Sequence, residues 1–222
     1  MFNSIAHRYD FLNHFLSLGI DRRWRKKLVK VVSHSDPKII LDVATGTADL
    51  AIEMARLKPH KITGVDISEK MLEFGSLKLG KKRLENLITL RQSDAGMLPF
   101  ADNTFDLTTV AFGVRNFENL EQGLKEICRV TRSGGNIAVL EFTMPAHFPV
   151  KQIYRFYFRF LLPRIGRWVS KDSGAYSYLP ESVESFPHGK AFAARLEEAG
   201  FNNVGITRLT FGIAAIYFAA KP

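Results

Sequence analysis

Acidic residues that could hold a nucleoside lie in or at the ends of three apolar runs of the sequence. Asp42 lies in the stretch LDVATGTADL (41–50), and Asp66 and Asp94 end the second and third runs. A carboxylate at the end of a strand can accept hydrogen bonds from both hydroxyls of a ribose. We therefore predict that Asp66 binds a ribose. We also predict that Asp94, with the backbone of Ala95, binds the amino group of an adenine.

The turn after the first apolar run limits which nucleotide the site can hold. Its residues, ATGTAD (44–49), lack the G-x-G-x-x-G pattern of dinucleotide-binding turns and the Gly-Lys-Ser/Thr of a P-loop. Asp49, at the start of the next helix, would repel a pyrophosphate. S-adenosylmethionine fits better, because it carries a sulfonium and an amino acid in place of phosphates. The sequence therefore predicts this cofactor.

A parallel sheet is needed to bring these residues together. Apolar runs that alternate with amphipathic segments predict an α/β, Rossmann-like, doubly wound sheet of seven mostly parallel strands. The last two runs are separated by Thr210 alone, which predicts an antiparallel C-terminal strand. A turn at SGG (133–135) should end the helix before the fifth strand. The predicted strands are 38–44, 61–67, 88–94, 105–112, 136–142, 203–209 and 211–221, and the helices are 49–57, one after an N-cap at Ser68, 119–131 and 188–200.

Two segments lie outside this alternation within a single predicted domain, 1–222. Residues 1–35 are expected to form a helical cap, and residues 144–187 an insertion after the fifth strand. The net charge of +9 comes from these parts: residues 1–30 hold seven Lys/Arg and two Asp, and residues 151–171 hold six Lys/Arg and no acid. Such segments suit nucleic acid or an anionic membrane surface, or serve only as solvated faces.

The cysteine, histidine and hydropathy patterns indicate the cellular compartment and whether a metal site is expected. A single Cys128, no signal-peptide pattern and no long apolar run predict a protein of the reducing cytosol. The six histidines show no metal-ligand spacing, so we expect no metal.

Longer motifs resemble those of one family over nearly the whole chain. They are IAHRYDFLNHFLSLGIDRRWR (5–25), LPFADNTFDLTTVAFGVRN (98–116) and LPRIGRWVSKDSGAYSYLPESVESFP (162–187). They are similar to the ubiquinone/menaquinone biosynthesis C-methyltransferases, a family of class I S-adenosylmethionine-dependent enzymes. The resemblance implies methylation of a ring carbon of a polyprenylated quinol, either demethylmenaquinol or a methoxy-polyprenyl-benzoquinol.

The resemblance also implies which residues bind the cofactor. These are Thr47, Asp66, Asp94, Ala95 and Ala111, and Asp42 and Gly46 of the first turn complete the predicted site. The family commonly has Ser near Ala111, so this residue could contribute only its backbone. Ala48 stands where glycine is usual. We expect the change to be tolerated, because a residue that enters the helix needs no special backbone angle.

Methylation of a ring carbon requires a neighbouring phenolic hydroxyl to lose its proton, so the site must favour an oxyanion. The candidate catalytic residues are Arg115 and Asn116 of the FGVRN stretch. We predict that Arg115 stabilises the oxyanion or orients a water that takes the proton. The alternative is that Arg115 forms an ion pair with Glu141. Tyr9 and Asp10 either close over the cofactor or serve in capping and packing.

The insertion at residues 144–187 indicates which partners the protein could contact. Its aromatic and basic stretch, PVKQIYRFYFRFLLPRIGRW (149–168), suits a helix at a membrane interface, where a polyprenyl tail resides. The alternative is packing on the core or in a homodimer. Tyr176 and Tyr178 are either phenolic bases or packing residues, and we favour packing. Rival functions are methylation of another small molecule and a non-catalytic lipid-interface or nucleic-acid-binding protein. AFGVRN (111–116) stands where an RNA N-methyltransferase would need Asn/Asp-Pro-Pro-Tyr, so we expect no nucleic acid.

Overall fold

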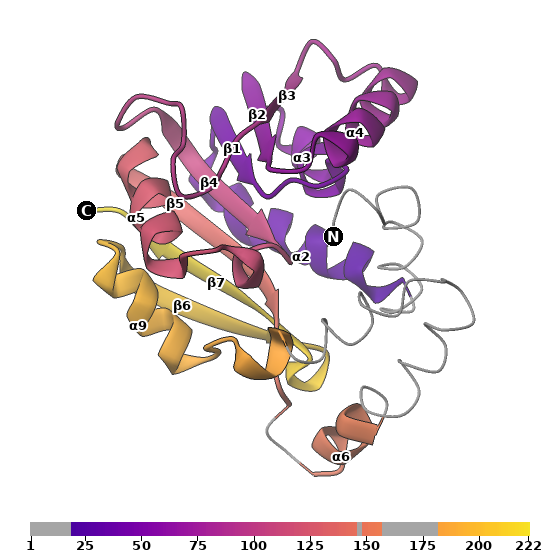
Figure 1. Cartoon of the computed structure of the whole chain (residues 1–222), viewed down its shortest axis with the longest axis vertical. Helices are drawn as coiled ribbons and strands as arrows, with labels where there is room; N and C mark the ends of the chain where they lie inside the picture. The colour runs from indigo at the N-terminus through magenta and orange to yellow at the C-terminus, as the bar shows by residue number, and fades with distance from the viewer. Residues whose placement is uncertain (1–18, 146–147, 157–181) are drawn as a thin grey trace.

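A seven-stranded sheet in the order β3-β2-β1-β4-β5-β7-β6 forms the centre of the molecule (Figure 1). The computed structural model describes residues 19–145, 148–156 and 182–222. Strands β1 to β5 are parallel, and β7 is antiparallel to both β5 and β6. The predicted fold class is confirmed. The strands are β1 Ile39–Val43, β2 Lys61–Asp66, β3 Ile88–Gln92, β4 Phe105–Ala111, β5 Thr131–Phe142, β6 Asn202–Leu209 and β7 Ala214–Ala220.

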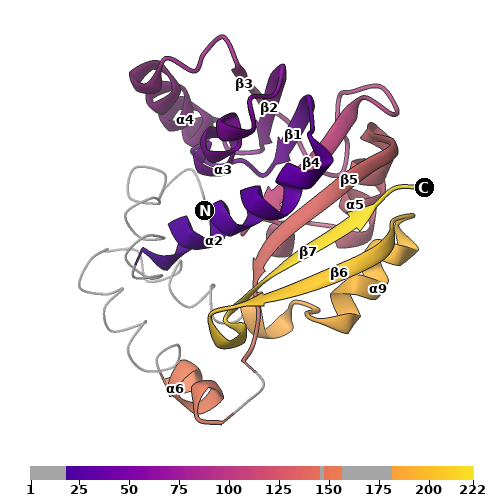
Figure 2. The same ribbon diagram turned by 180° about the vertical axis from the view of Figure 1, so that it is seen from behind.

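Helices cover both faces of this sheet (Figures 1 and 2). On one face, Leu124 and Phe192 pack in a cluster with β-strand residues such as Val139. On the other, Leu28 and Met54 pack in a cluster around β1 and β4. The helices are α2 Ile20–Val32, α3 Asp49–Met54, α4 Glu69–Lys82, α5 Leu120–Val130, α6 Val150–Phe156 and α9 Lys190–Glu198, with short 3₁₀ turns η1 Ser33–Ser35, η2 Ala55–Leu57, η3 Val114–Asn116 and η5 Thr210–Gly212.

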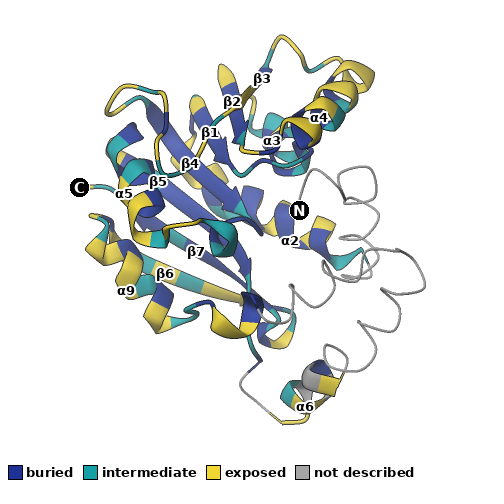
Figure 3. Cartoon of the chain, in the orientation of Figure 1, coloured by how far each residue is buried: buried dark blue, intermediate teal, exposed yellow. Residues whose placement is uncertain are grey.

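The central strands are buried on both faces because helices cover each side, as their continuous apolar runs predicted. Figure 3 shows β1, β4 and β5 largely as buried residues, whereas the outer faces of α4 and α9 are exposed. The predicted cap of α4 is confirmed, since Ser68 accepts a hydrogen bond from the Met71 N–H at 3.3 Å.

The prediction of a turn at residues 133–135 was wrong. Helix α5 ends at Val130, and these residues belong to β5, where the pairing with β4 shifts register. Gly134 adopts φ +74°, and its N–H donates to the carbonyl of Lys221 at 2.9 Å. Glycine here marks a bulge that the C-terminal end of the chain stabilises.

The link between β6 and β7 is also longer than predicted. It spans residues 210–213 and contains η5, instead of Thr210 alone. Of the expected N-terminal cap, the structure describes only residues 19–35, which form α2 and η1. Tyr9, Asp10, Tyr176, Tyr178 and most of the aromatic insertion lie outside the described residues. Within the described ranges, no helix combines the length and hydropathy that crossing a membrane requires.

Candidate functional site

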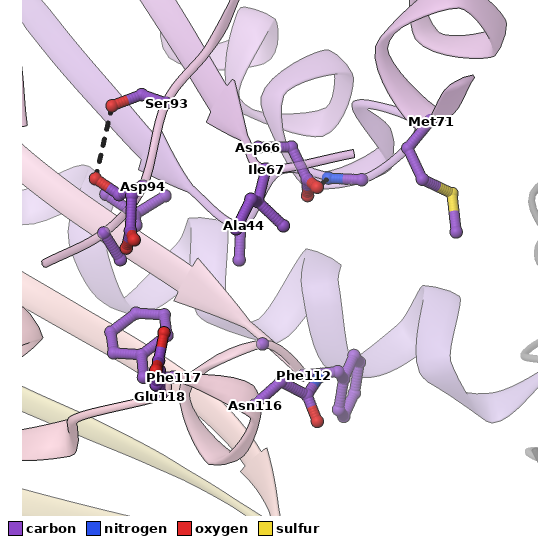
Figure 4. A pocket seen from close by; sticks show the side chains of 14 residues that line it. Ala44, Asp66, Ile67, Met71, Ser93, Asp94, Phe112, Asn116, Phe117 and Glu118 are labelled. Carbon is purple, nitrogen blue, oxygen red and sulfur yellow. Dashed lines mark hydrogen bonds between the residues drawn. The ribbon is translucent and has the colours of Figure 1, made fainter. Parts of the chain in front are cut away.

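A cavity of about 130 Å³ lies at the carboxyl edge of the sheet (Figure 4). Parallel strands bring their carboxyl ends to this edge, and ligands of such folds bind there. The cavity is formed by the segments that follow β1, β2, β3 and β4. It is lined by Val43, Ala44, Gly46, Asp66, Ile67, Met71, Ser93, Asp94, Ala95, Phe112, Gly113, Asn116, Phe117 and Glu118.

Asp66 occupies the position that the sequence predicted, at the end of β2 and on the cavity wall. Its Oδ2 accepts a hydrogen bond from the Gly46 N–H at 2.8 Å, and its Oδ1 accepts one from the Ser68 N–H at 2.9 Å. Burial raises the pKa of this carboxyl, although both backbone bonds oppose the rise. A carboxylate has about four acceptor positions, so Asp66 can fix the turn and still receive two ligand hydroxyls.

Asp94 and Ala95 also line the cavity, on the segment after β3. Asp94 Oδ1 accepts a hydrogen bond from the Gly96 N–H at 2.8 Å, which orients the side chain. Figure 4 shows Asp94, Asp66 and Asn116 around one opening, each contributed by a different segment of the carboxyl edge. The structure therefore brings together five of the predicted site residues: Gly46, Asp66, Asp94, Ala95 and Asn116.

Three other predicted residues line a smaller, adjacent hollow. Asp42, Thr47 and Ala111 form part of its wall, and it shares Ala44, Gly46 and Phe112 with the larger cavity. Its remaining lining residues are Arg25, Thr45, Asp49 and Leu50.

Charged side chains surround this adjacent hollow. Arg25 pairs with Asp21 at 2.6 Å and with Asp49 at 3.5 Å. Lys78 Nζ lies 2.6 Å from Asp49 and donates to Thr47 Oγ1 at 2.7 Å. The hollow therefore offers two carboxylates and the Arg25 guanidinium next to the turn, and Lys78 contacts its wall through Thr47 and Asp49.

Asp42 lies beneath the turn and holds it in place. Its side chain is buried and accepts hydrogen bonds from the hydroxyls of Thr45, at 2.6 Å, and Thr109, at 2.8 Å. Burial raises its pKa from 3.8 to about 6, and the two hydroxyls limit the rise. The structure gives Asp42 a structural role in the turn, and direct contact with the cofactor stays a prediction.

An Asp42→Asn variant should gain stability relative to the native protein as the pH rises. Because the folded pKa lies above the unfolded one, the native fold loses stability as the pH rises from about 4 to about 6. Asparagine does not ionise, so its stability does not fall in this way. The difference in the free energy of unfolding between the variant and the native protein should therefore grow to about 2–3 kcal/mol and then level off. Urea unfolding of both proteins from pH 4 to pH 7.5 measures it. A difference that stays constant over this range would contradict the account.

The expectation that Ala48 enters the helix with ordinary backbone angles was wrong, and that the change is tolerated stays a prediction. Ala48 does not enter the helix with ordinary angles but precedes α3 in a left-handed conformation, with φ 66° and ψ 22°. This conformation costs a non-glycine residue about 1–2 kcal/mol. The methyl group is fully buried against the helix layer, and its burial offsets about 0.8 kcal/mol of that cost.

Arg115 does not line the cavity. Its Nη1 donates to Glu141 Oε1 at 2.6 Å and to the Phe112 carbonyl at 2.8 Å, and the two side chains are 7% and 0% exposed. The alternative of an ion pair with Glu141 is confirmed. Burial raises the pKa of Glu141, and Arg115 is the main group that opposes the rise. The guanidinium thus already serves a buried carboxylate and holds η3 against β5.

Sequence reasoning missed the apolar and small residues of the cavity wall. Ile67 directly follows Asp66, and Phe112 and Gly113 directly follow β4. A Cβ atom on Gly113 would lie 2.5 Å from the Cβ of Ala44, so only glycine lets these two loops approach so closely. Their signal was positional: Ile67 and Phe112 are the last residues of predicted strands and Gly113 follows directly, at the edge where the ligand was expected.

Comparisons with known proteins show which family the sequence matches. The sequence matches the ubiE/COQ5 methyltransferase family over residues 1–221. It is 46% identical over 222 residues to a demethylmenaquinone methyltransferase of Bacteroides fragilis, covering 100% of this chain and 91% of that protein. It is 45% identical to the ubiquinone/menaquinone biosynthesis C-methyltransferase UbiE of Geotalea daltonii, covering 100% of this chain and 94% of that protein.

Solved structures share the fold. A putative S-adenosylmethionine-dependent methyltransferase from Methanococcus maripaludis superposes with a TM-score of 0.67. The sequences are 19% identical, and the match covers 99% of this chain and 93% of the other. At this identity the likeness concerns the fold alone.

Proposed function

Because the chain belongs to the ubiE/COQ5 methyltransferase family, we propose that it methylates a ring carbon of a polyprenylated quinol, with demethylmenaquinol as the preferred substrate. The chain is an S-adenosylmethionine-dependent methyltransferase. The similarity to demethylmenaquinone methyltransferases supports the naphthoquinol as substrate. A methoxy-polyprenyl-benzoquinol is the second candidate, because UbiE proteins are equally similar to the chain.

The observation that carries this proposal is the joint placement of Asp66 and Asp94 on one cavity. We assign the ribose to Asp66 and the adenine to Asp94 and Ala95. Ile67 and Phe117 offer apolar surface for the base. The described lining contains the acids Asp66, Asp94 and Glu118 and no lysine or arginine. This charge pattern fits a cationic nucleoside that has no phosphates.

The amino-acid end of the cofactor extends, in this proposal, from Gly46 into the adjacent hollow. Asp49, Arg25 and Lys78 are complementary to an ammonium and a carboxylate. Thr47, Asp42 and the backbone of Ala111 then lie near this end, as the family resemblance implies. The two hollows share three lining residues, which supports one ligand that occupies both.

Bound S-adenosylmethionine supplies an electrophilic methyl group, and the protein must hold the quinol in line with it. Asn116 lies on the cavity wall, so its amide can orient the ring hydroxyl whose deprotonation activates the neighbouring carbon. Arg115 positions Asn116, because its ion pair with Glu141 holds the η3 turn that contains both residues. The structure favours this positioning role over direct contact of Arg115 with the oxyanion.

We further propose a cytoplasmic protein that makes peripheral contact with the inner face of an anionic membrane. A polyprenyl tail partitions into lipid, so the enzyme must reach its substrate there. The concentration of basic residues in 1–30 and 151–171 supports this contact. A homodimer built on the aromatic insertion is the other proposed use of that segment.

The proposed function is tested by incubating the protein with methyl-deuterated S-adenosylmethionine and each of the two quinols. We expect mass spectrometry to find the labelled methyl group on the ring carbon of the naphthoquinol, with slower or no transfer to the benzoquinol. Transfer to neither quinol, with the cofactor bound, would contradict the proposal.

A further inference from the structure

The turn between β6 and β7 holds a strained and exposed phenylalanine. Thr210, Phe211 and Gly212 have φ values of 43°, 56° and 89°, so three consecutive residues are left-handed. This region is unfavourable for a β-branched or bulky residue, and it persists only where neighbouring contacts enforce it. The Phe211 side chain is nevertheless 80% exposed. The strain thus presents an aromatic ring to the solvent.

Hydrogen bonds from two other elements enforce this turn. Trp24 Nε1 of α2 donates to Thr210 Oγ1 at 2.8 Å. Thr143, just after β5, donates from its hydroxyl to the Gly212 carbonyl at 2.7 Å and from its N–H to the Ile213 carbonyl at 2.9 Å. The fold therefore fixes the turn firmly, yet it gains little burial from the ring of Phe211. A costly exposed ring of this kind suggests contact with a partner.

Basic residues share a hollow with Phe211. Lys151, Lys190 and Arg208 line the same hollow as Phe211, which measures about 690 Å³, and Glu184 is the only acid among its described lining residues. None of these three cations pairs with an acid in the part of the chain that the structure describes. Their positive charges can therefore bind a partner, and such a partner should be anionic.

A second exposed aromatic residue lies close by in the sequence. Phe148 comes three residues before Lys151 and is also 80% exposed. Lys151 of helix α6 lines the same hollow as Phe211, so the segment that contains Phe148 and Lys151 borders the η5 turn. Exposed phenylalanines next to unpaired cations are typical of surfaces that insert apolar groups between anionic lipid head groups.

We propose that Phe148, Lys151, Lys190, Arg208 and Phe211 form a docking surface for an anionic lipid bilayer. This inference rests on the proposed function, because a polyprenylated quinol must be collected from lipid. The aromatic rings enter the head-group boundary, and the cations bind lipid phosphates. The docking surface belongs to described residues on α6 and the turn before it, η5, β6 and α9, and it is separate from the cofactor cavity.

Vesicle co-sedimentation of the full chain tests the docking surface. Vesicles of phosphatidylcholine, alone or mixed with phosphatidylglycerol, are compared for the native protein, Phe211→Ser and a Lys151→Ser/Lys190→Ser/Arg208→Ser variant. We expect binding to the mixed vesicles only, weakened about tenfold by Phe211→Ser and abolished by the triple change. Leu77→Ser on α4, where the side chain is 63% exposed, is the matched control and should bind like the native protein.

Equal binding of native protein and Phe211→Ser, or equal binding to both kinds of vesicle, would overturn the docking surface. A native dimer in size-exclusion chromatography that Phe211→Ser dissociates would assign the surface to a second copy of the chain instead. Methyl transfer to a short-chain, water-soluble demethylmenaquinol keeps the two proposals apart. Phe211→Ser should methylate this soluble quinol normally and the vesicle-embedded quinol slowly, whereas a native protein inactive on both would refute the proposed function.

Discussion

An Asp66→Ala variant should bind S-adenosylmethionine at least about a hundredfold more weakly than the native protein. Removal of the carboxylate would leave the ribose without two hydrogen bonds. Hydrogen bonds to a charged group contribute about 1.5–3 kcal/mol each. A loss of about 3 kcal/mol corresponds to about a hundredfold in the dissociation constant. The variant would also leave the Gly46 and Ser68 N–H groups without their acceptor, which loosens the turn. Titration calorimetry measures the affinity.

Two further variants give this experiment its controls. Asp66→Asn keeps the shape and one acceptor oxygen, so its affinity should fall between those of the native protein and the alanine variant. Asp102→Ala removes a carboxylate that is 67% exposed and pairs with Arg129 away from the cavity, and it should leave cofactor binding unchanged. If the Asp66→Ala variant binds the cofactor with native affinity, Asp66 does not bind the ribose.

An Arg115→Met variant should lose about 3–5 kcal/mol of stability, because it leaves the fully buried Glu141 without its charge partner. The loss should be smaller at low pH, since the raised pKa of Glu141 allows it to bind a proton there. Chemical denaturation at pH 5 and pH 7.5 measures both effects. Equal stability of variant and native protein would contradict the structural role of the pair.

The double variant Arg115→Met/Glu141→Met separates a positioning role from direct catalysis. Apolar replacement of both partners of a buried ion pair is often nearly neutral, so most of the stability should return. If Arg115 acts through the η3 turn, the double variant should regain turnover together with stability. A double variant that is stable, binds the cofactor and transfers no methyl group would place Arg115 in the chemistry.

The sequence was sufficient for the parts of the fold that local pattern controls. Short apolar runs predicted all seven strands, and Ser68 predicted the start of α4, because burial and capping leave a local signal. The bulge at Gly134 could not be predicted in this way. It depends on pairing with Lys221, almost ninety residues further along the chain.

The site shows the same division. Asp66 and Asp94 were predictable because acids that end apolar runs must meet at the carboxyl edge of a parallel sheet. For Arg115, the sequence left two roles open: stabilisation of the quinol oxyanion, or an ion pair with Glu141. The answer depends on the ends of β4 and β5 lying side by side, which brings Glu141 to the η3 turn. The docking surface escaped notice because the left-handed turn at Phe211 has no recognisable sequence signal.

The central claim is that one S-adenosyl nucleoside spans the carboxyl edge of this sheet, and a crystal structure of the protein with S-adenosylhomocysteine tests it most directly. We predict that both ribose hydroxyls lie within hydrogen-bonding distance of the Asp66 carboxylate, the adenine amino group at Asp94, and the amino-acid end beside Gly46 and in the adjacent hollow. A nucleoside bound elsewhere, or bound here with Asp66 making no contact to the ribose, would contradict it.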